Sequence, residues 1–176
     1  MDPCGRLNQV TATKISFCRP ASEDNNTVHC WFRNHVVITD NMKYNIGYKE
    51  NPMHLKTPPL SSEYTMHTEE KDGGEFLVCT VGKTVLHYNI DCIKDLHQML
   101  KARGDWMELG SADEQKLAKD DTVEAWGRSS GNPVGGWYGM KKGLRGRFGM
   151  YIPPLMEALG LAEVTHEARG NKMRAK

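Results

Sequence analysis

The sequence predicts an α+β fold: a three-stranded antiparallel meander plus a helix, followed by short helices and a C-terminal β-hairpin. Three observations carry this prediction. Strand-type runs alternate with glycine turns between residues 64 and 88, a helical apolar period ends at a glycine between residues 91 and 104, and two short strand-type runs close the chain. The 176 residues suffice for one domain, or for one domain and a tail.

The first 54 residues look unlike the rest of the chain. They mix Asn, Thr, Cys and His without a sustained helical period, and their one strand-like run is residues 35–39. The hydrophobic content of the whole chain, 39%, is low for a globular protein, which indicates that part of it packs poorly. We therefore predict a weakly ordered N-terminal extension over residues 1–54 and a single α+β domain over residues 55–176. A further hypothesis is that the extension lies upstream of a natural start at Met53.

The meander is predicted from three segments and the two turns between them. Apolar and polar residues alternate over residues 64–68, and residues 76–81 and 84–88 read as buried strands. The turns are Asp72-Gly73-Gly74 and Gly82-Lys83, both typical of tight hairpins. Cys79, inside the second run, is expected to be a small buried hydrophobic residue.

A helix follows the meander. Its apolar face is formed by Ile93, Leu96 and Leu100, which recur at helical spacing. Asn89 or Asp91 is expected to cap its first turn, and Gly104 to end it. His97 lies off the apolar stripe and is expected at the surface.

The chain then changes character twice. Residues 105–124 hold seven acids against two lysines, a net charge of −5. Ser111 and Glu114 match a capping box, and residues 122–126 are expected to add one helical turn. Residues 127–149 contain eight of the 17 glycines. Pro153-Pro154 is expected to open a short helix, and residues 162–166 and 171–174 to form a hairpin.

The C-terminal segment is the candidate functional region. Residues 137–176 carry eight Lys or Arg and three acids, a net charge of +5, although the whole chain has a net charge of only +1. Residues 137–151 interleave four aromatic side chains with four cations, the pattern of a surface that neutralises phosphates and stacks on bases. The candidate nucleic-acid-binding residues are Trp137, Tyr138, Lys141, Lys142, Arg145, Arg147, Arg169, Lys172 and Arg174. The alternative is that the aromatics belong to the core and the cations to a solvated rim.

The last residues also resemble a winged helix. A short helix at residues 155–160 runs into a basic hairpin, the order of a recognition helix at the major groove and a wing on the backbone. The long glycine-rich connection before this helix departs from the tight turn of a helix-turn-helix. A hairpin that only closes the core is the alternative.

Two other functions remain open at this point. The acidic segment 105–124 and the basic segment 137–176 have opposite charges, so they predict a protein–protein or self-associating module, with a homo-oligomer as partner. A metal-dependent enzyme would use the acids of residues 105–124 with His97, but no metal-ligand spacing and no catalytic motif occurs. His67 and His87 are expected at the surface or against a neighbouring strand. The sequence predicts no cofactor and no metal, and it favours a binding protein over an enzyme.

The compartment follows from what the sequence lacks. No apolar run approaches a membrane span, the first thirty residues lack the apolar core of a signal peptide, and the five scattered cysteines do not form a disulfide framework. We expect a cytoplasmic protein that binds DNA or RNA and is not attached to a membrane.

Three stretches carry a resemblance to a known family: residues 105–110 (DWMELG), 132–139 (NPVGGWYG) and 145–151 (RGRFGMY). The chain is similar in them to a small uncharacterised bacterial protein family, a domain of unknown function. The similarity runs from about residue 55 to residue 176. It implies that residues 55–176 form one unit, and it implies no substrate and no catalytic residue.

Overall fold

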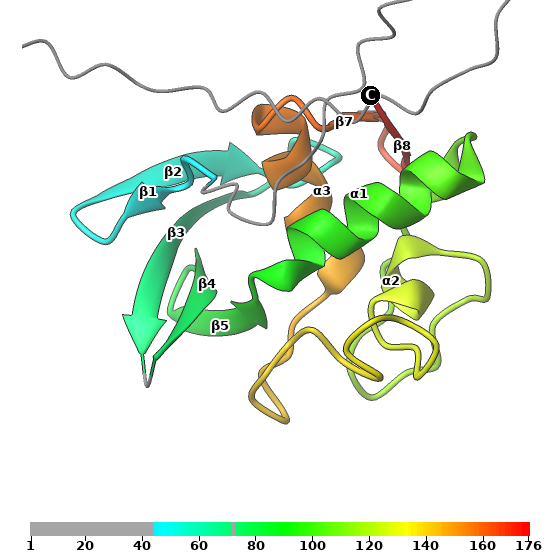
Figure 1. Ribbon diagram of the computed structural model, residues 1–176. Helices are drawn as coiled ribbons and strands as arrows, with labels where there is room; N and C mark the ends of the chain where they lie inside the picture. Colours follow the sequence, from blue (N-terminus) through cyan, green and yellow to red (C-terminus); the bar gives the residue numbers. More distant parts are fainter. Residues whose placement is uncertain (1–43, 72) are drawn as a thin grey trace, which may run out of the picture. The chain divides into compact units, whose positions relative to one another are not determined.

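The computed structural model of the protein describes residues 44–71 and 73–176, and the strand-like run at residues 35–39 lies outside them. The α+β prediction is confirmed: strands β1–β5 precede a region of short helices and a small sheet (Figure 1). The elements are β1 (Gly47–Tyr48), β2 (Asn51–Lys56), β3 (Glu63–Lys71), β4 (Gly74–Val81), β5 (Thr84–Asn89), α1 (Asp91–Arg103), β6 (Met107–Glu108), α2 (Val123–Trp126), α3 (Phe148–Ala158), β7 (Ala162–Val164) and β8 (Lys172–Ala175).

The first sheet has five strands, in the order β1-β2-β3-β4-β5, and every neighbouring pair is antiparallel. The predicted meander is its β3–β5 part. In the register, Met66 faces Cys79, and Cys79 faces Leu86. All three side chains are buried, so this row lies on the face of the sheet that meets the helices.

Strands β1 and β2 extend the sheet ahead of residue 55. Met53 pairs with Met66, and Leu55 with Tyr64, so β2 adds its side chains to the same buried face. Sequence patterning did not reveal this strand because Asn51-Pro52 opens it with two residues that disfavour strands. A chain beginning at Met53 would lack β1 and the first two residues of β2.

Helix α1 follows its prediction closely. Gly104 ends it at φ 71°, a left-handed conformation that suits glycine, and donates its N–H to the Leu100 carbonyl at 3.0 Å. At the other end the cap position is Ile90, and Asn89 Oδ1 accepts the Asp91 N–H at 2.9 Å. The surface prediction for His97 was wrong, because its side chain is buried. His67 is buried too, opposite Val78 of the neighbouring strand β4.

The second sheet contains the predicted hairpin as β7 and β8, together with one unpredicted strand. Its order is β6-β8-β7, because Met107 pairs with Met173 on the open side of β8. The helical turn predicted at residues 122–126 is α2, and Thr122 caps it by accepting the Ala125 N–H at 3.1 Å.

Helix α3 begins at Phe148, five residues before the proline pair that was expected to open it. The glycine-rich composition hid this start. A Cβ on Gly149 would lie 2.1 Å from the Leu109 carbonyl oxygen, so the glycine is needed for the close approach of the chain before α2. Pro153 and Pro154 therefore lie inside the helix and are buried.

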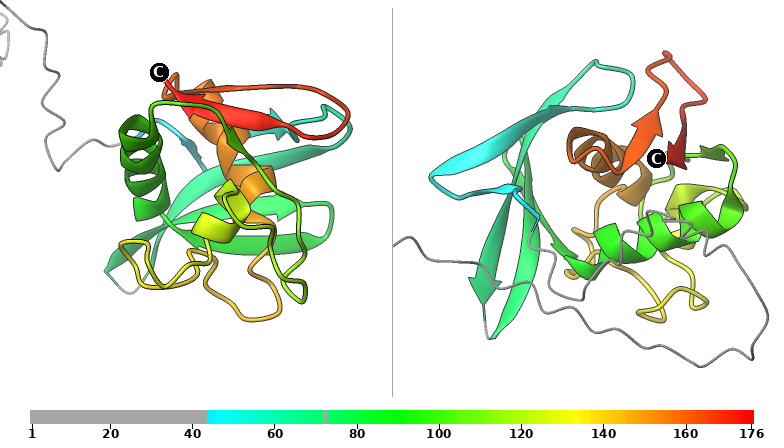
Figure 2. Two further views of the ribbon diagram at one scale, coloured as in Figure 1. Left: turned by 90° about the vertical axis from the view of Figure 1, so that its right-hand side faces the viewer. Right: turned by 45° about the horizontal axis from the view of Figure 1, so that its top comes forward.

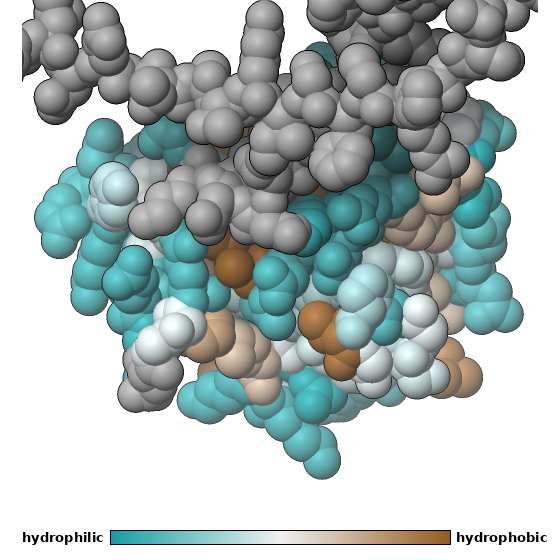
Figure 3. All heavy atoms as spheres, in the orientation of Figure 1, coloured by the Kyte–Doolittle hydropathy of each residue, from teal (hydrophilic) through white to brown (hydrophobic). Residues whose placement is uncertain are grey.

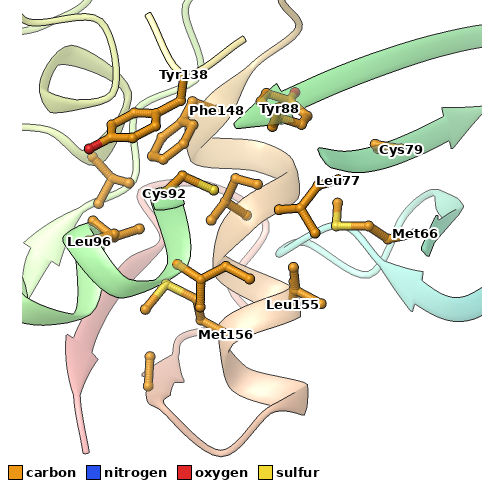
Figure 4. Packing of buried hydrophobic residues seen from close by; sticks show 14 of the residues in the cluster. Met66, Leu77, Cys79, Tyr88, Cys92, Leu96, Tyr138, Phe148, Leu155 and Met156 are labelled. Atoms are coloured by element: carbon orange, nitrogen blue, oxygen red, sulfur yellow. The ribbon is translucent and has the colours of Figure 1, made fainter. Parts of the chain in front are cut away.

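One apolar core joins both sheets to the helices, whereas the described residues on the face shown in Figure 3 are mostly hydrophilic, with only small separate apolar patches. Figure 4 shows Leu155 and Met156 of α3 between α1 and the side chains of β3 and β4. The Tyr64 hydroxyl also donates to the Tyr151 carbonyl at 2.8 Å, which ties α3 to the large sheet. The turn between β7 and β8 lies beside the turn between β2 and β3 (Figure 2). There His166 Nδ1 lies 2.9 Å from the Pro58 carbonyl oxygen.

Candidate nucleic-acid interface

An acidic loop, residues 111–121, connects β6 to α2, and Arg128 anchors its main chain. The guanidinium donates to the carbonyls of Asp113 at 3.1 Å and Lys116 at 3.0 Å, and also to the Ala112 carbonyl. Glu124 neutralises the same guanidinium through its Oε1, 2.7 Å from Arg128 Nε. The loop therefore keeps a defined course although it contains no helix or strand.

Glu114 binds the glycine-rich loop, residues 139–147, that leads into α3. Its two carboxylate oxygens accept the backbone N–H groups of Gly143 at 2.8 Å and Arg145 at 3.2 Å. The Arg145 guanidinium lies 3.9 Å away. The Gly143 N–H is the main reason that the pKa of Glu114 lies below its ordinary value. The predicted capping box is wrong, because this side chain serves a distant loop rather than a helix N-terminus.

Asp113 forms the second contact between the two loops. Its Oδ1 accepts from Arg147 Nε at 2.6 Å and lies 2.5 Å from Nη2. The ion pair is half exposed, since the side chains keep 42% of the Arg147 surface and 49% of the Asp113 surface accessible. Two of the predicted phosphate ligands, Arg145 and Arg147, thus already interact with carboxylates of the same chain.

A cleft of about 710 Å³ lies between the acidic loop, the start of α3 and the β7–β8 turn. The left view of Figure 2 shows the acidic loop in yellow-green and the β7–β8 turn in orange to red, on the same side of the small sheet. The charged residues that line the cleft are Glu108, Asp113, Lys116, Lys119, Arg147 and Arg169. Both acids are paired, Glu108 with Lys119 at 2.6 Å and Asp113 with Arg147. Among the described residues, Lys116 and Arg169 have no ion-pair partner, so the cleft is cationic.

Two smaller clefts adjoin this one. The first, of about 600 Å³, shares Asp113, Lys116 and Arg147 with it and extends along the glycine-rich loop. The second, of about 350 Å³, is lined by Lys116 and Trp137. Lys116 therefore borders all three clefts.

Of the two aromatic residues predicted to stack on bases, Tyr138 lies in the core and Trp137 is covered by arginine side chains. Tyr138 is fully buried: its ring stacks on Phe148 (Figure 4) and on Trp126, and its hydroxyl donates to Asp95 at 2.7 Å. The guanidinium carbons of Arg128 and Arg145 lie 4.4 and 4.8 Å from the Trp137 ring centre. In this arrangement the Tyr138 ring has no free face for a base, and cations already cover the Trp137 ring.

The remaining predicted residues differ in how free they are. Arg174 pairs with Glu163 at 2.6 Å, and its guanidinium packs over Trp106. Lys141 and Lys142 are exposed on the glycine-rich loop. Lys172 is exposed on β8, opposite Glu108 in the register. None of these three lysines forms an ion pair within the described part of the chain.

Most acids of the acidic segment, residues 105–124, have a basic partner within the chain. Five of its seven acids have a basic partner: Glu108 with Lys119, Asp113 with Arg147, Glu114 with Arg145, Asp121 with Arg103, and Glu124 with Arg128. Only two of these partners, Arg145 and Arg147, belong to the basic segment 137–176, so the complementarity that suggested pairing across a dimer is used in part within one chain.

Three further observations concern metal ions, cysteine reactivity and membrane-spanning helices. Within residues 44–71 and 73–176, no group of three or more His, Cys, Asp or Glu side chains is placed to hold a metal ion. Burial raises the pKa of the Cys79 and Cys92 thiols, which makes them poor nucleophiles. No helix in the same part of the chain combines the length and apolar character needed to cross a bilayer.

Sequence reasoning missed Lys116, Lys119 and Arg128. The two lysines are outnumbered by acids in residues 105–124, so charge counting gave them no weight. They nevertheless lie on either side of Leu117, which is 99% exposed. For Arg128 a signal was present: Glu124 lies four residues before it, the spacing of a helical ion pair.

Comparison with known proteins yields one match. Residues 45–176 match a family described as a family of unknown function (DUF6855), and the match begins two residues before β1. No curated protein and no solved structure matches the chain. The matched region covers the whole sheet and the cleft as well as the helices, so the chain belongs to this family of unknown function.

Proposed function

We propose that this domain binds nucleic acid through the phosphate backbone, which lies in the cationic cleft between the acidic loop and the β7–β8 turn. One observation carries the proposal. Four cations line the cleft against two acids, and both acids are already paired, which leaves Lys116 and Arg169 on its walls without an ion-pair partner among residues 44–71 and 73–176. Cations without a partner are the groups that gain most from a phosphate.

The topology of the second half supports duplex DNA as the ligand. The elements follow one another as α1, β6, α2, α3, β7 and β8, and β8 lies between β6 and β7. A winged helix has the same succession, with a strand before the helical pair that joins the hairpin sheet. By this analogy, the β7–β8 turn with Arg169 corresponds to a wing on the DNA backbone.

The same geometry argues against base reading by α3. Seven residues of this helix are buried, and it contains no Lys, Arg, Asn or Gln. Backbone contacts position a protein on nucleic acid but carry no sequence information. With the aromatic rings buried or covered as well, we propose binding that depends weakly on sequence and favours a duplex over a single strand.

Fluorescence anisotropy of the full chain with duplex DNA, single-stranded DNA and RNA tests the proposal. We expect duplex binding that weakens as salt rises. The double variant Lys116→Ala plus Arg169→Ala should reduce the slope of log K against log salt by about 2, since each lost phosphate contact contributes about 0.9.

The matched control is Lys49→Ala plus Lys71→Ala, which removes two exposed cations from the β1–β2 turn and the end of β3, away from the residues that line the three clefts. This control should keep the wild-type slope. The proposal is overturned if wild-type protein binds none of the three ligands at low salt, or if both double variants reduce the slope equally.

A further inference from the structure

Resting on the proposed function, we infer that Asp113 and Glu114 are intramolecular competitors of the phosphate backbone. Their carboxylates occupy the donors of residues 143–147, and a nucleic-acid phosphate displaces them. The glycine-rich loop would then be a second phosphate-binding site beside the cationic cleft, closed by the chain's own acids until a ligand arrives.

The donors gathered in residues 143–147 are those of a phosphate site. Two backbone N–H groups, from Gly143 and Arg145, converge on one carboxylate. The Arg147 guanidinium presents two nitrogens to the other. Backbone N–H groups and guanidinium nitrogens together are a common donor set for phosphate oxygens, and a carboxylate satisfies the same donors with less charge.

The two acids are able to leave without unfolding their loop. Arg128 holds the loop through the main-chain carbonyls of Asp113 and Lys116, and those bonds do not involve the acidic side chains. The Asp113–Arg147 pair is also half exposed, so water screens it and little free energy opposes its exchange for another anion.

The position of the pair connects the two sites. Asp113 and Arg147 line both the cleft of about 710 Å³ and the adjoining cleft of about 600 Å³. A backbone that enters the larger cleft at Arg169 therefore meets Arg147 at the boundary. When the Asp113 carboxylate turns away, Arg147 is free to bind a phosphate from either side.

The test compares two charge-matched double variants of the full chain. Asp113→Asn plus Glu114→Gln removes the competing charges and keeps one accepting oxygen on each side chain, so the glutamine retains at most one of the two backbone bonds of Glu114. Glu70→Gln plus Glu75→Gln removes two exposed acids that face each other near the far hairpin of the large sheet. Both variants raise the net charge by the same amount, so only position distinguishes them.

We expect the first variant to bind a short duplex DNA roughly five- to tenfold more tightly than wild type at moderate salt, because it removes the half-exposed Asp113–Arg147 pair and the less exposed Glu114 carboxylate. Its salt slope should steepen by up to about 1, because no carboxylate then competes with the phosphate for Arg147. The control should change the affinity by less than about twofold, because distant exposed charges are screened.

Three results overturn the inference, and they differ from one another. Equal gains in the two variants would show an effect of net charge alone. Weaker binding by the first variant, with an unchanged melting temperature, would show that the acids hold the loop for the ligand. If neither the wild type nor either variant binds, the proposed function itself fails. Should the double variant melt early, the single variants Asp113→Asn and Glu114→Gln replace it, each with an expected gain of roughly two- to threefold.

Discussion

Glu124 and Arg128 form a buried ion pair one helical turn apart, with 0% of the Glu124 side chain and 9% of the Arg128 side chain exposed. Glu124 Oε2 also accepts the Gly149 N–H at 2.7 Å, at the start of α3. Burial raises the pKa of Glu124, and the Gly149 N–H and Arg128 oppose this shift. The pair thus joins the acidic loop, α2 and α3.

Replacement of Arg128 by Met should therefore be costly. It leaves the Glu124 carboxylate buried without its counter-charge and frees the acidic loop, so we expect the free energy of unfolding to fall by about 3–5 kcal/mol. Urea denaturation followed by circular dichroism measures the change. Arg103→Met, which breaks the exposed pair with Asp121, is the control and should change stability little. A small effect at Arg128 would contradict its role as the anchor of the loop.

Acidification should loosen the contact between Glu114 and the glycine-rich loop. The pKa of Glu114 is lowered in the folded protein, so its stabilising contribution is complete above its ordinary pKa of 4.5 and is lost as pH falls through the lowered value. The stability difference between wild type and Glu114→Gln should therefore be large at pH 7 and should shrink toward pH 3. Denaturant unfolding at both pH values measures it, and the comparison cancels the opposite contribution of Glu124. A difference that stays constant with pH would refute this account.

Gly149→Ala should destabilise the domain, because the added methyl group would meet the Leu109 carbonyl oxygen at 2.1 Å. We expect a loss of about 1–3 kcal/mol, the usual cost of overpacking, seen as a lower melting temperature. Gly136→Ala provides the matched control. Its methyl group would meet nothing within 4 Å, so the melting temperature should stay near that of wild type. Equal shifts in both variants would mean that Gly149 of α3 and Leu109, the residue after β6, do not approach each other this closely.

His166→Ala should release the β7–β8 turn from the rest of the domain. The ring joins the Pro58 carbonyl through Nδ1 and Glu157 Oε2 through Nε2, at 2.9 and 3.0 Å. Both partners are acceptors, so the two bonds form together only when both ring nitrogens carry a proton. Loss of the ring is expected to cost about 1–2 kcal/mol, and the upper figure applies to that protonated form. Hydrogen exchange should become faster at the amides of the turn, residues 165–171, and not in β4. His54→Ala, at an exposed position on β2, should leave the exchange of both regions unchanged.

The parts of the fold that could be predicted are those that local chemistry decides. The β4–β5 hairpin follows from its glycine turn and buried runs, and Gly104 marks the end of α1. Strand β2 and the start of α3 could not be predicted in this way. Their residues acquire their structure from distant partners: β2 from pairing with β3, and the first turn of α3 from packing against Leu109.

The candidate site, too, could be predicted only where local sequence decides it. Charge counting located the basic segment correctly, but it could not show that Arg145 and Arg147 already interact with acids more than thirty residues away. The sequence spacing predicted that Glu114 forms a capping box with Ser111, whereas in the fold its carboxylate accepts from the distant N–H groups of Gly143 and Arg145. Tyr138 looked available because it adjoins lysines in sequence, and the burial of its ring depends on Trp126 and Phe148.

The order of strands in the two sheets has a consequence for how the chain folds. In the five-stranded sheet each strand pairs with its neighbour in sequence, so every pairing closes a short loop at small entropic cost. The small sheet instead joins Met107 to Met173, across the acidic loop, the glycine-rich loop and α3. Contacts so distant in sequence form slowly. We expect refolding to build the meander first and the small sheet last, so that the cationic cleft, walled by residues from both ends of that long connection, takes shape only in the final step.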